Sequence, residues 1–223
     1  MDLYALIVAG GTGRRMGTVI PKQFLELAGK PVLMHTAERF YSFDPQIKII
    51  IVLPGDRFSL WNELKVKHSF KLPHSLAEGG QTRFESVRNG LALVDDESLV
   101  AIHDGVRPLV STNTIRNCFE TAALYGNAIP AVSPADSVRM VTDAGNIPVN
   151  RHCLRLIQTP QVFYSRLIKK AYSTDFCPEF TDDAMVLEKS GEDIRIVEGN
   201  RENIKITNPE DLIIAETLLP GVS

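Results

Sequence analysis

One stretch near the N-terminus, residues 9–22, concentrates residue types that bind phosphate groups. Glycines recur through residues 9–17, and Arg14, Arg15 and Lys22 add positive charge. Glycine allows tight turns in which backbone N–H groups approach a ligand, and phosphate oxygens accept hydrogen bonds from such groups. Because the glycines follow directly on an apolar run, the pattern predicts a phosphate-binding loop at the end of a strand.

This loop departs from two common nucleotide-binding patterns. A P-loop requires Gly-Lys-Ser/Thr, which does not occur in it, and a dinucleotide fingerprint requires a third glycine where Met16 stands. No acidic residue closes the second apolar run, since Leu53 is followed by Pro54 and Gly55. The pattern therefore argues against a Rossmann dehydrogenase. A structural glycine turn with two solvated arginines is the alternative to phosphate binding.

Two isolated charged residues follow or interrupt other apolar runs. Asp104 follows residues 99–102 after one intervening histidine, His103, and its carboxylate is the kind of oxygen ligand that Mg²⁺ prefers. An ordinary aspartate in a turn is the alternative there. Lys205 lies within the otherwise apolar residues 203–206. A buried charge is costly unless it is paired, so a bound phosphate is a suitable partner, with an exposed edge strand as the alternative.

The elements that position these residues follow from the spacing of apolar residues. Short continuous apolar runs predict buried strands, and longer runs with helical spacing predict helices. The predicted strands are residues 3–8, 47–53, 99–102 and 128–132, and the predicted helices are residues 31–41, 56–67, 82–94 and 112–125. Strands and helices alternate, which is typical of an α/β protein. We expect a doubly wound, mostly parallel, Rossmann-like sheet whose ligands lie beyond the C-terminal strand ends.

The pattern changes between residues 135 and 161, where apolar and polar residues alternate loosely around a turn at residues 143–146. This predicts a β-hairpin arm that protrudes from a single domain of residues 1–223. Beyond the arm, the predicted elements are helices near 164–173 and 182–189, strands near 194–197 and 203–206, and a last helix that starts at Asn208. Asn208 suits the cap of that helix, and Pro209 suits its first position.

Composition excludes several classes of function. A net charge of −3 lacks the basic excess of a nucleic-acid-binding protein, so we expect no nucleic-acid partner. The apolar runs fall short of the ~18 residues that a membrane span needs, so we expect no membrane partner. Cys118, Cys153 and Cys177 are odd in number and widely spaced, which favours a reducing, cytoplasmic location over a disulfide framework.

Residues 9–17, Ala-Gly-Gly-Thr-Gly-Arg-Arg-Met-Gly, continue to Pro-Lys-Gln-Phe-Leu at residues 21–25. This combination resembles the signature of the sugar-phosphate nucleotidyltransferases, and within them the CTP-using branch. Essentially end to end, the chain is similar to the family of cytidylyltransferases that act on 2-C-methyl-D-erythritol 4-phosphate. The resemblance implies transfer of CMP from CTP to that polyol phosphate, with release of pyrophosphate, in non-mevalonate isoprenoid synthesis. A sister enzyme acting on ribitol 5-phosphate is the alternative, since it resembles the same motifs.

Two more segments match family motifs. Residues 79–87 resemble G-G-x-x-R-x-x-S-V, which recognises the cytosine base in the family, and residues 203–211 resemble N-I-K-[VI]-T-x-P-E-D. Three positions depart from the pattern. Gln81 stands where some members carry an acidic residue, Ser137 where threonine is common, and residues 105–106 are Gly-Val in place of an alanine pair.

The resemblance also implies a role for each matching residue. For catalysis it implies Arg15, Lys22 and Lys205, which would neutralise the triphosphate and stabilise its α-phosphate. For nucleotide binding it implies Ala9, Gly10, Gly11, Thr12, Gly13, Gly80, Gln81, Arg83, Ser86 and Asp104. For acceptor binding it implies Asp104, Arg107, Ser137, Arg151, Thr159 and Thr181. It further implies Mg²⁺, held mostly through phosphates with Asp104 nearby, and a homodimer formed through the arm. A regulatory protein that has lost catalysis would lack the three catalytic cations, which are present here.

Overall fold

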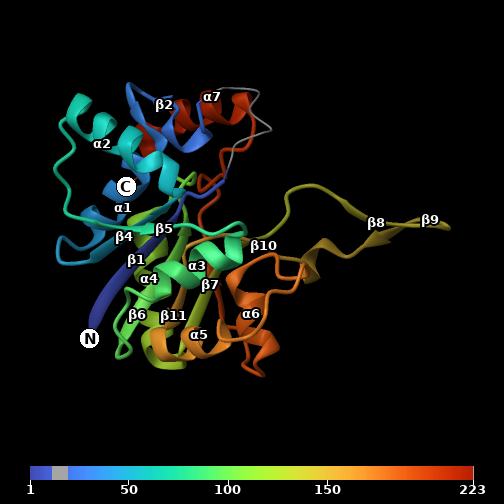
Figure 1. Ribbon diagram of the computed structural model, residues 1–223. Helices are drawn as coiled ribbons and strands as arrows, with labels where there is room; N and C mark the ends of the chain where they lie inside the picture. The colour runs from blue at the N-terminus through green and yellow to red at the C-terminus, as the bar shows by residue number, and fades with distance from the viewer. Residues whose placement is uncertain (12–19, 223) are drawn as a thin grey trace.

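The computed structural model describes residues 1–11 and 20–222 and is built around one eight-stranded sheet (Figure 1). β1 (Asp2–Val8) pairs in parallel with β4 (Lys48–Leu53) on one side and with β6 (Ser98–Asp104) on the other. β4 pairs in parallel with β5 (Ser75–Glu78). The chain leaves β1 first toward β4 and later toward β6. The C-terminal end of β1 is therefore a topological switch point, where open α/β sheets bind ligands.

The other half of the sheet contains an antiparallel insertion. β11 (Gln161–Tyr164) lies between β6 and β7 (Asn127–Val132) and runs antiparallel to both. β7 also pairs with the short β10 (Leu156–Ile157) and, in parallel, with β12 (Ile196–Glu198). The prediction of a mostly parallel, doubly wound sheet is confirmed, and the two antiparallel strands, β10 and β11, were not foreseen.

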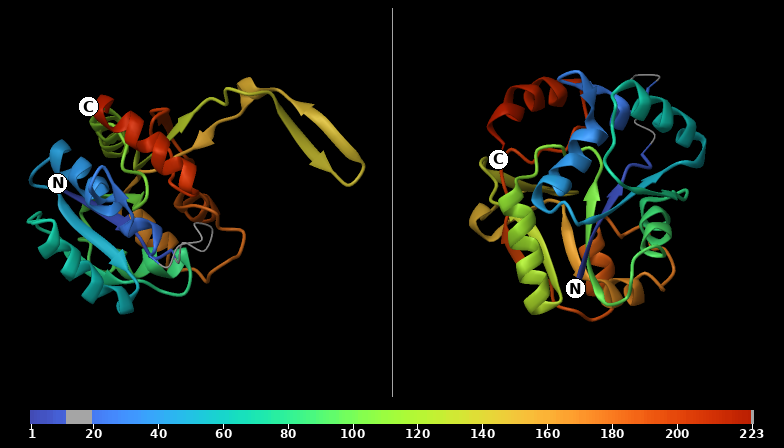
Figure 2. Two further views of the ribbon diagram at one scale, coloured as in Figure 1. Left: turned by 90° about the horizontal axis from the view of Figure 1, so that it is seen from above. Right: turned by 90° about the vertical axis from the view of Figure 1, so that its left-hand side faces the viewer.

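Helices cover both faces of this sheet, as the two views of Figure 2 show. Alternate residues of β1 point to opposite faces, so Ala5 and Ile7 pack with one set of helices and Leu6 with the other. The first set is α1 (Val32–Phe43), α2 (Phe58–Lys67) and α4 (Thr112–Tyr125). The second set is α3 (Arg83–Leu91), α5 (Ser165–Ala171) and α6 (Asp183–Lys189).

Local capping explains where several of these helices begin and end. The Thr82 side chain accepts a hydrogen bond from the backbone of Glu85, and the Glu85 carboxylate accepts one from the backbone of Thr82, which makes a capping box for α3. Ser111 caps α4 in the same position, and α4 ends at Gly126, whose φ of 86° suits glycine. α7 (Pro209–Leu218) starts after Asn208 with Pro209 at its first position, as predicted, and the Asp211 carboxylate accepts a hydrogen bond from the Asn208 backbone at 2.8 Å.

The predicted arm is present but shorter than expected. β8 (Val138–Thr142) and β9 (Gly145–Val149) form a separate antiparallel ladder that projects from the body of the protein (Figures 1 and 2). Residues 158–161, which the prediction gave to the arm, are instead buried, and Gln161 opens β11. A short pair of strands, β2 (Glu26–Leu27) and β3 (Lys30–Pro31), precedes α1.

The predicted strand at residues 203–206 does not form. This segment is attached to the loop after β6 by isolated hydrogen bonds: Ile206 N–H donates to the Val106 carbonyl at 2.9 Å, and Arg107 Nη1 donates to the Asn203 carbonyl at 2.7 Å. Within residues 1–11 and 20–222, none of the helices combines the length and the apolar character that a membrane span requires.

Candidate active site

A cavity of about 360 Å³ lies at the C-terminal ends of β1 and β6. It brings together the start of the glycine-rich loop, the turn into α3, the end of β6 and the segment before α7. The predicted site residues that line it are Ala9, Gly10, Gly11, Lys22, Gly80, Gln81, Arg83, Ser86, Asp104 and Lys205. Segments separated by nearly the whole chain thus share one cavity, as the sheet topology predicts.

Part of the glycine-rich loop lies outside the described residues. Thr12, Gly13 and Arg15 belong to this part. Their roles in nucleotide binding and catalysis therefore remain predictions.

A second cavity, of about 230 Å³, adjoins the first and shares Arg83, Asp104 and Lys205 with it. Its further lining includes three residues predicted for the acceptor, namely Arg107, Thr159 and Thr181. The predicted nucleotide and acceptor residues of the body therefore form two adjoining spaces with a common wall.

Asp104 is the carboxylate at the centre of this wall. It is only 7% exposed, and three cations surround it: Lys205 Nζ lies 2.9 Å from Oδ2, Arg107 Nε 3.2 Å from Oδ2, and Arg83 Nε 3.6 Å from Oδ1. Burial by itself would raise the pKa of Asp104, but the charges of these neighbours outweigh it and hold the pKa well below its ordinary range. Asp104 is therefore an anion at neutral pH that orients three cations.

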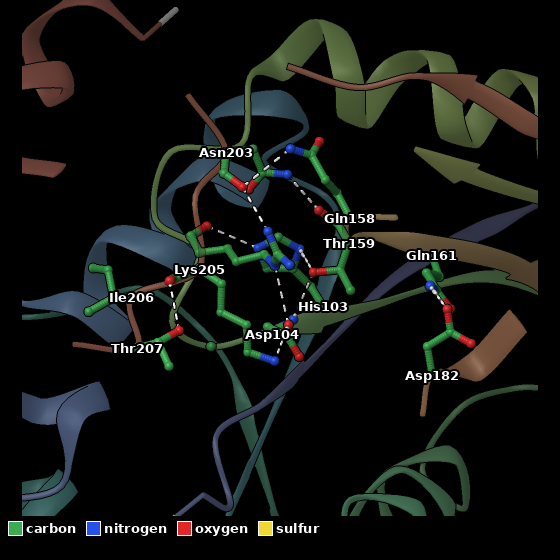
Figure 3. Close-up of polar contacts among 12 residues, drawn as sticks. His103, Asp104, Gln158, Thr159, Gln161, Asp182, Asn203, Lys205, Ile206 and Thr207 are labelled. Carbon is green, nitrogen blue, oxygen red and sulfur yellow. Dashed lines mark hydrogen bonds and ion pairs between the residues drawn. The ribbon is translucent and has the colours of Figure 1, made fainter. Parts of the chain in front are cut away.

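Hydrogen bonds connect the backbone of Asp104 to Thr159, and Thr159 to His103 (Figure 3). The Asp104 N–H donates to Thr159 Oγ1 at 3.1 Å, and His103 contacts Thr159 Oγ1 through Nδ1 at 3.0 Å and the Arg107 carbonyl through Nε2 at 3.1 Å. A carbonyl only accepts, so Nε2 carries the proton and the threonine hydroxyl donates to Nδ1. Burial lowers the pKa of His103 to about 4, so the ring is neutral.

Lys205 is not the buried lysine of an apolar strand that the sequence predicted. Its side chain is 41% exposed, and its partner is the Asp104 carboxylate. Lys22 contacts the same segment, since its Nζ donates to the Ile206 carbonyl at 3.0 Å. The segment 203–206 therefore places two ammonium groups at the first cavity.

Ser86 and Gln23 hold the glycine-rich turns in place. The Ser86 hydroxyl accepts a hydrogen bond from Gly80 N–H at 3.1 Å and donates to the Thr82 carbonyl at 2.9 Å. A Cβ atom on Gly10 would lie 3.2 Å from the same hydroxyl, so the two loops approach closely. Buried Gln23 donates through Nε2 to the Ala9 carbonyl at 2.6 Å. Its place in the Pro-Lys-Gln-Phe-Leu run was the only signal for this role.

Arg83 is paired rather than solvated. Its Nη1 and Nη2 donate to the two oxygens of Asp183 at 2.8 and 2.7 Å. Although desolvation would lower the pKa of Arg83, the charges of Asp183 and Asp104 raise it. No local pattern indicates this partnership, because an aspartate at a helix start also suits the helix dipole.

The structure does not bring Ser137 and Arg151 to either cavity. Both are exposed at the base of the arm, and Arg151 Nη1 donates to the Ala135 carbonyl at 2.5 Å. The arm points away from the body of its own chain (Figure 1). Among the residues that the structure describes, those lining these two cavities belong to the body, and none belongs to the β8–β9 arm.

Comparisons with known proteins agree along the whole chain. The model of the 2-C-methyl-D-erythritol 4-phosphate cytidylyltransferase family matches residues 3–220. A protein of that name from Bacteroides fragilis is 52% identical over 215 residues, which cover 96% of this chain and 98% of that protein. One from Clostridium botulinum is 42% identical over 96% of this chain and 98% of its own length.

Solved structures show the same similarity. The 4-diphosphocytidyl-2C-methyl-D-erythritol synthase of Anaerococcus prevotii has a TM-score of 0.82 at 30% identity, covering 98% of this chain and 96% of that one. The 2-C-methyl-D-erythritol 4-phosphate cytidylyltransferase of Thermus thermophilus has a TM-score of 0.80 at 29% identity, covering 99% of this chain and 100% of that one.

Proposed function

Because the chain belongs to the 2-C-methyl-D-erythritol 4-phosphate cytidylyltransferase family, we propose that it transfers CMP from CTP to 2-C-methyl-D-erythritol 4-phosphate and releases pyrophosphate. The product is the CDP-polyol of non-mevalonate isoprenoid synthesis. One structural observation supports this reaction most directly: two adjoining cavities share a wall of Arg83, Asp104 and Lys205. Two phosphorylated substrates that react with each other need such a shared, cation-rich boundary.

The chemistry requires no nucleophile from the protein. An oxygen of the acceptor phosphate attacks the α-phosphorus of CTP, a new P–O bond forms, and the bond to the β-phosphate oxygen breaks as pyrophosphate leaves. The acceptor phosphate is already ionised at neutral pH, so the protein has to align the reactants and stabilise the charge that gathers on the α-phosphate.

The cations of the first cavity suit this task. Lys22 approaches from the glycine-rich loop, and we assign it to the triphosphate and the departing pyrophosphate, together with Arg15. Lys205 lies in the shared wall, and we assign it to the α-phosphate. The Asp104 carboxylate keeps the Lys205 ammonium at this position in the absence of substrate. Glycine backbone groups and Ser86 line the part of the cavity that we assign to the nucleoside.

The second cavity suits the acceptor. Arg107 and Thr181 line it, and Thr159 lies next to Asp104. Ser137 and Arg151 complete the proposed acceptor site only if an arm reaches the cavity of another chain. We therefore propose a homodimer in which each arm serves its partner. The projection of the arm away from its own body supports this arrangement.

The residues present suit a metal ion held through phosphates rather than a metal cage. Among the described residues, no group of three or more His, Cys, Asp or Glu side chains comes together, and Asp104 already faces three cations. We propose that Mg²⁺ enters with the triphosphate, with Asp104 near it. When bound, it would neutralise phosphate charge and lower the barrier to attack. A cytoplasmic location is part of the proposal, supported by three free cysteines.

The comparisons favour methylerythritol phosphate over the ribitol phosphate alternative. Pyrophosphate release with CTP and Mg²⁺ tests this choice when the two acceptors are supplied separately. Turnover with 2-C-methyl-D-erythritol 4-phosphate alone is expected. Turnover with D-ribitol 5-phosphate alone would keep the chemistry but overturn the acceptor.

A further inference from the structure

Asp183 is a buried carboxylate that the proposed reaction does not use. It is the first residue of α6, and its exposure is 0%. Three donors satisfy it: Nη1 and Nη2 of Arg83, at 2.8 and 2.7 Å, and the Tyr172 hydroxyl, at 2.6 Å. A bidentate arginine–carboxylate pair fixes orientation as well as distance. Asp183 therefore determines the plane in which the Arg83 guanidinium lies.

The remaining nitrogen of that guanidinium faces the active site. Arg83 Nε lies 3.6 Å from Asp104 Oδ1, and the side chain, which is 31% exposed, lines both cavities. Arg83 thus contacts two carboxylates from opposite sides. With its plane set by Asp183, the guanidinium meets Asp104 through Nε, which at 3.6 Å from Oδ1 lies beyond hydrogen-bond distance.

The turn that carries Asp183 is itself anchored to the sheet. Asp182 accepts a hydrogen bond from Gln161 Nε2 at 3.0 Å (Figure 3), and Gln161 Oε1 accepts one from Ala184 N–H at 2.8 Å. Thr181, on the same turn, lines the second cavity. The start of α6 therefore connects β11, the acceptor side of the site and Arg83.

Tyr172 supports Asp183 from the interior. The ring is 2% exposed and stacks on Phe84 at 4.6 Å between ring centroids, next to Arg83 in the chain. Burial and the neighbouring carboxylate raise the pKa of Tyr172 well above its ordinary value, so the hydroxyl stays a donor to Asp183.

We propose that Asp183 is a positioning residue, supported by Tyr172, that holds Arg83 in the wall between the two cavities and keeps it from collapsing onto Asp104. This inference rests on the proposed function, because its effect on turnover presumes the two-substrate reaction. Without the Asp183 carboxylate, Asp104 is the nearest carboxylate for Arg83. A bidentate pair there would compete with Lys205 for Asp104 and disturb the cations at the reacting phosphates.

A double-mutant cycle tests the proposal with the isosteric change Asp183→Asn, the change Arg83→Gln and their combination. We expect D183N to lower kcat/KM for the acceptor about tenfold, which lies within the range of measured coupling between contacting residues. If Asp183 acts through Arg83, D183N in the R83Q chain costs nothing more. Losses that multiply in the double variant would overturn the proposal. The double variant removes both charges together and so avoids leaving one unpaired in the interior.

A matched pair of tyrosine changes distinguishes the positioning of Asp183 and Arg83 from a nonspecific loss of stability. Y172F removes a hydroxyl that contacts Asp183, whereas Y164F removes one that donates to Glu97 at the surface. We expect Y172F to lower kcat/KM in the same direction as D183N and Y164F to leave it unchanged, with thermal unfolding measured for both. Equal effects of the two changes would contradict the proposal.

A second measurement does not depend on turnover and so separates this proposal from the proposed function. The side-chain ¹⁵N signals of Arg83, assigned by their loss in R83Q, report how tightly the guanidinium is held. We expect slowed rotation of its terminal nitrogens in the wild type and faster rotation in D183N. An Arg83 signal unaffected by D183N would overturn the positioning role even in an active enzyme. The expected change in an enzyme silent with every acceptor would uphold that role and refute the proposed function.

Discussion

Lys205 Nζ lies 2.9 Å from Asp104 Oδ2, at the wall where the nucleotide and acceptor cavities meet. The two residues come from the end of β6 and the segment before α7, far apart in the chain. The carboxylate holds the ammonium at the boundary, and the ammonium in turn helps to keep the carboxylate ionised. The catalytic proposal depends on this pair.

Removing either lysine of the first cavity should slow the reaction severely. We expect Lys205→Ala and Lys22→Ala to lower kcat by about a hundredfold to a thousandfold, as loss of one preorganised electrostatic contact does in other enzymes. Because Asp104 keeps Arg83 and Arg107 as partners, the fold should survive in K205A. Pyrophosphate release measures the loss of kcat, and thermal unfolding shows whether the fold survives. Near-normal turnover in both variants would remove Lys22 and Lys205 from the catalytic assignment.

Changing the arm arginine should affect the acceptor alone. Arg151→Ala is expected to raise the KM for the polyol phosphate roughly tenfold to a hundredfold, the cost of losing charge-assisted hydrogen bonds to a phosphate. The KM for CTP should stay within about twofold, since Arg151 lines neither cavity of its own chain. A change confined to the CTP constants would show that the acceptor site is misplaced.

The same variant tests the shared site of the homodimer. R151A and K205A chains, unfolded and refolded together, should form hybrid dimers in which one site has both residues intact. With random pairing under two-fold symmetry, the mixture should recover about a quarter of wild-type activity, measured with the acceptor far below its KM, where the R151A chain alone is nearly inactive. Recovery no greater than the sum of the separate variants would mean that each arm does not serve its partner.

A strand can be predicted from the sequence when the apolar run that marks it is long and clearly bounded. β1, β4, β6 and β7 were predicted because each is a continuous apolar run near a glycine or proline, and the cavity residues at their ends followed. β11 has four residues, Gln161–Tyr164, directly after the alternating arm, so no period separates it from the hairpin. The Asn203–Ile206 run looked like a strand, but its backbone pairs with a loop instead of a strand.

Side-chain partnerships were harder to predict than elements. Asp183 at the start of α6 satisfies the expectation for a helix dipole, and that local explanation hid its long-range pairing with Arg83. Lys205 was correctly expected to need an anionic partner, but the partner in the protein is Asp104. Such pairings depend on how distant segments meet, which local patterns do not encode.

Gly105 should resist replacement by alanine. A Cβ atom there would lie 2.9 Å from the Ala9 Cβ and 3.1 Å from Leu33 Cδ1, at the join of β6 and the glycine-rich loop. We expect Gly105→Ala to lower the free energy of unfolding by about 1–3 kcal/mol, the usual cost of overpacking. Urea unfolding measures it, and adding Ala9→Gly should return part of the loss. Full stability of G105A would show that the loop yields without cost.

Protonation of His74 should lower the stability of the protein in mild acid. Trp61 Nε1 donates to His74 Nε2 at 3.0 Å, so His74 is neutral and protonated on Nδ1, which contacts the Leu72 carbonyl at 2.7 Å. Burial lowers the pKa of His74 in the folded protein, so the unfolded chain binds more protons near and below its ordinary pKa of about 6.5. The stability that the neutral ring contributes is therefore present above that pH and is lost as pH falls.

Trp61, the single tryptophan, reports this transition through its fluorescence. Urea titrations give the free energy of unfolding at each pH. Between pH 7.5 and pH 5.5, this free energy should fall more in the wild type than in His74→Gln. His35 and His103, whose pKa values burial also lowers, leave some pH dependence in the variant. An equal fall in both chains would show that His74 does not cause the loss of stability in mild acid.

The most direct test of the central claim is ³¹P NMR of the purified chain with CTP, Mg²⁺ and 2-C-methyl-D-erythritol 4-phosphate. We expect the acceptor phosphate and CTP to disappear together, while pyrophosphate and a new diphosphate diester appear in equal amounts. Release of orthophosphate, or hydrolysis of CTP without loss of the acceptor signal, would contradict transfer of CMP to the acceptor phosphate.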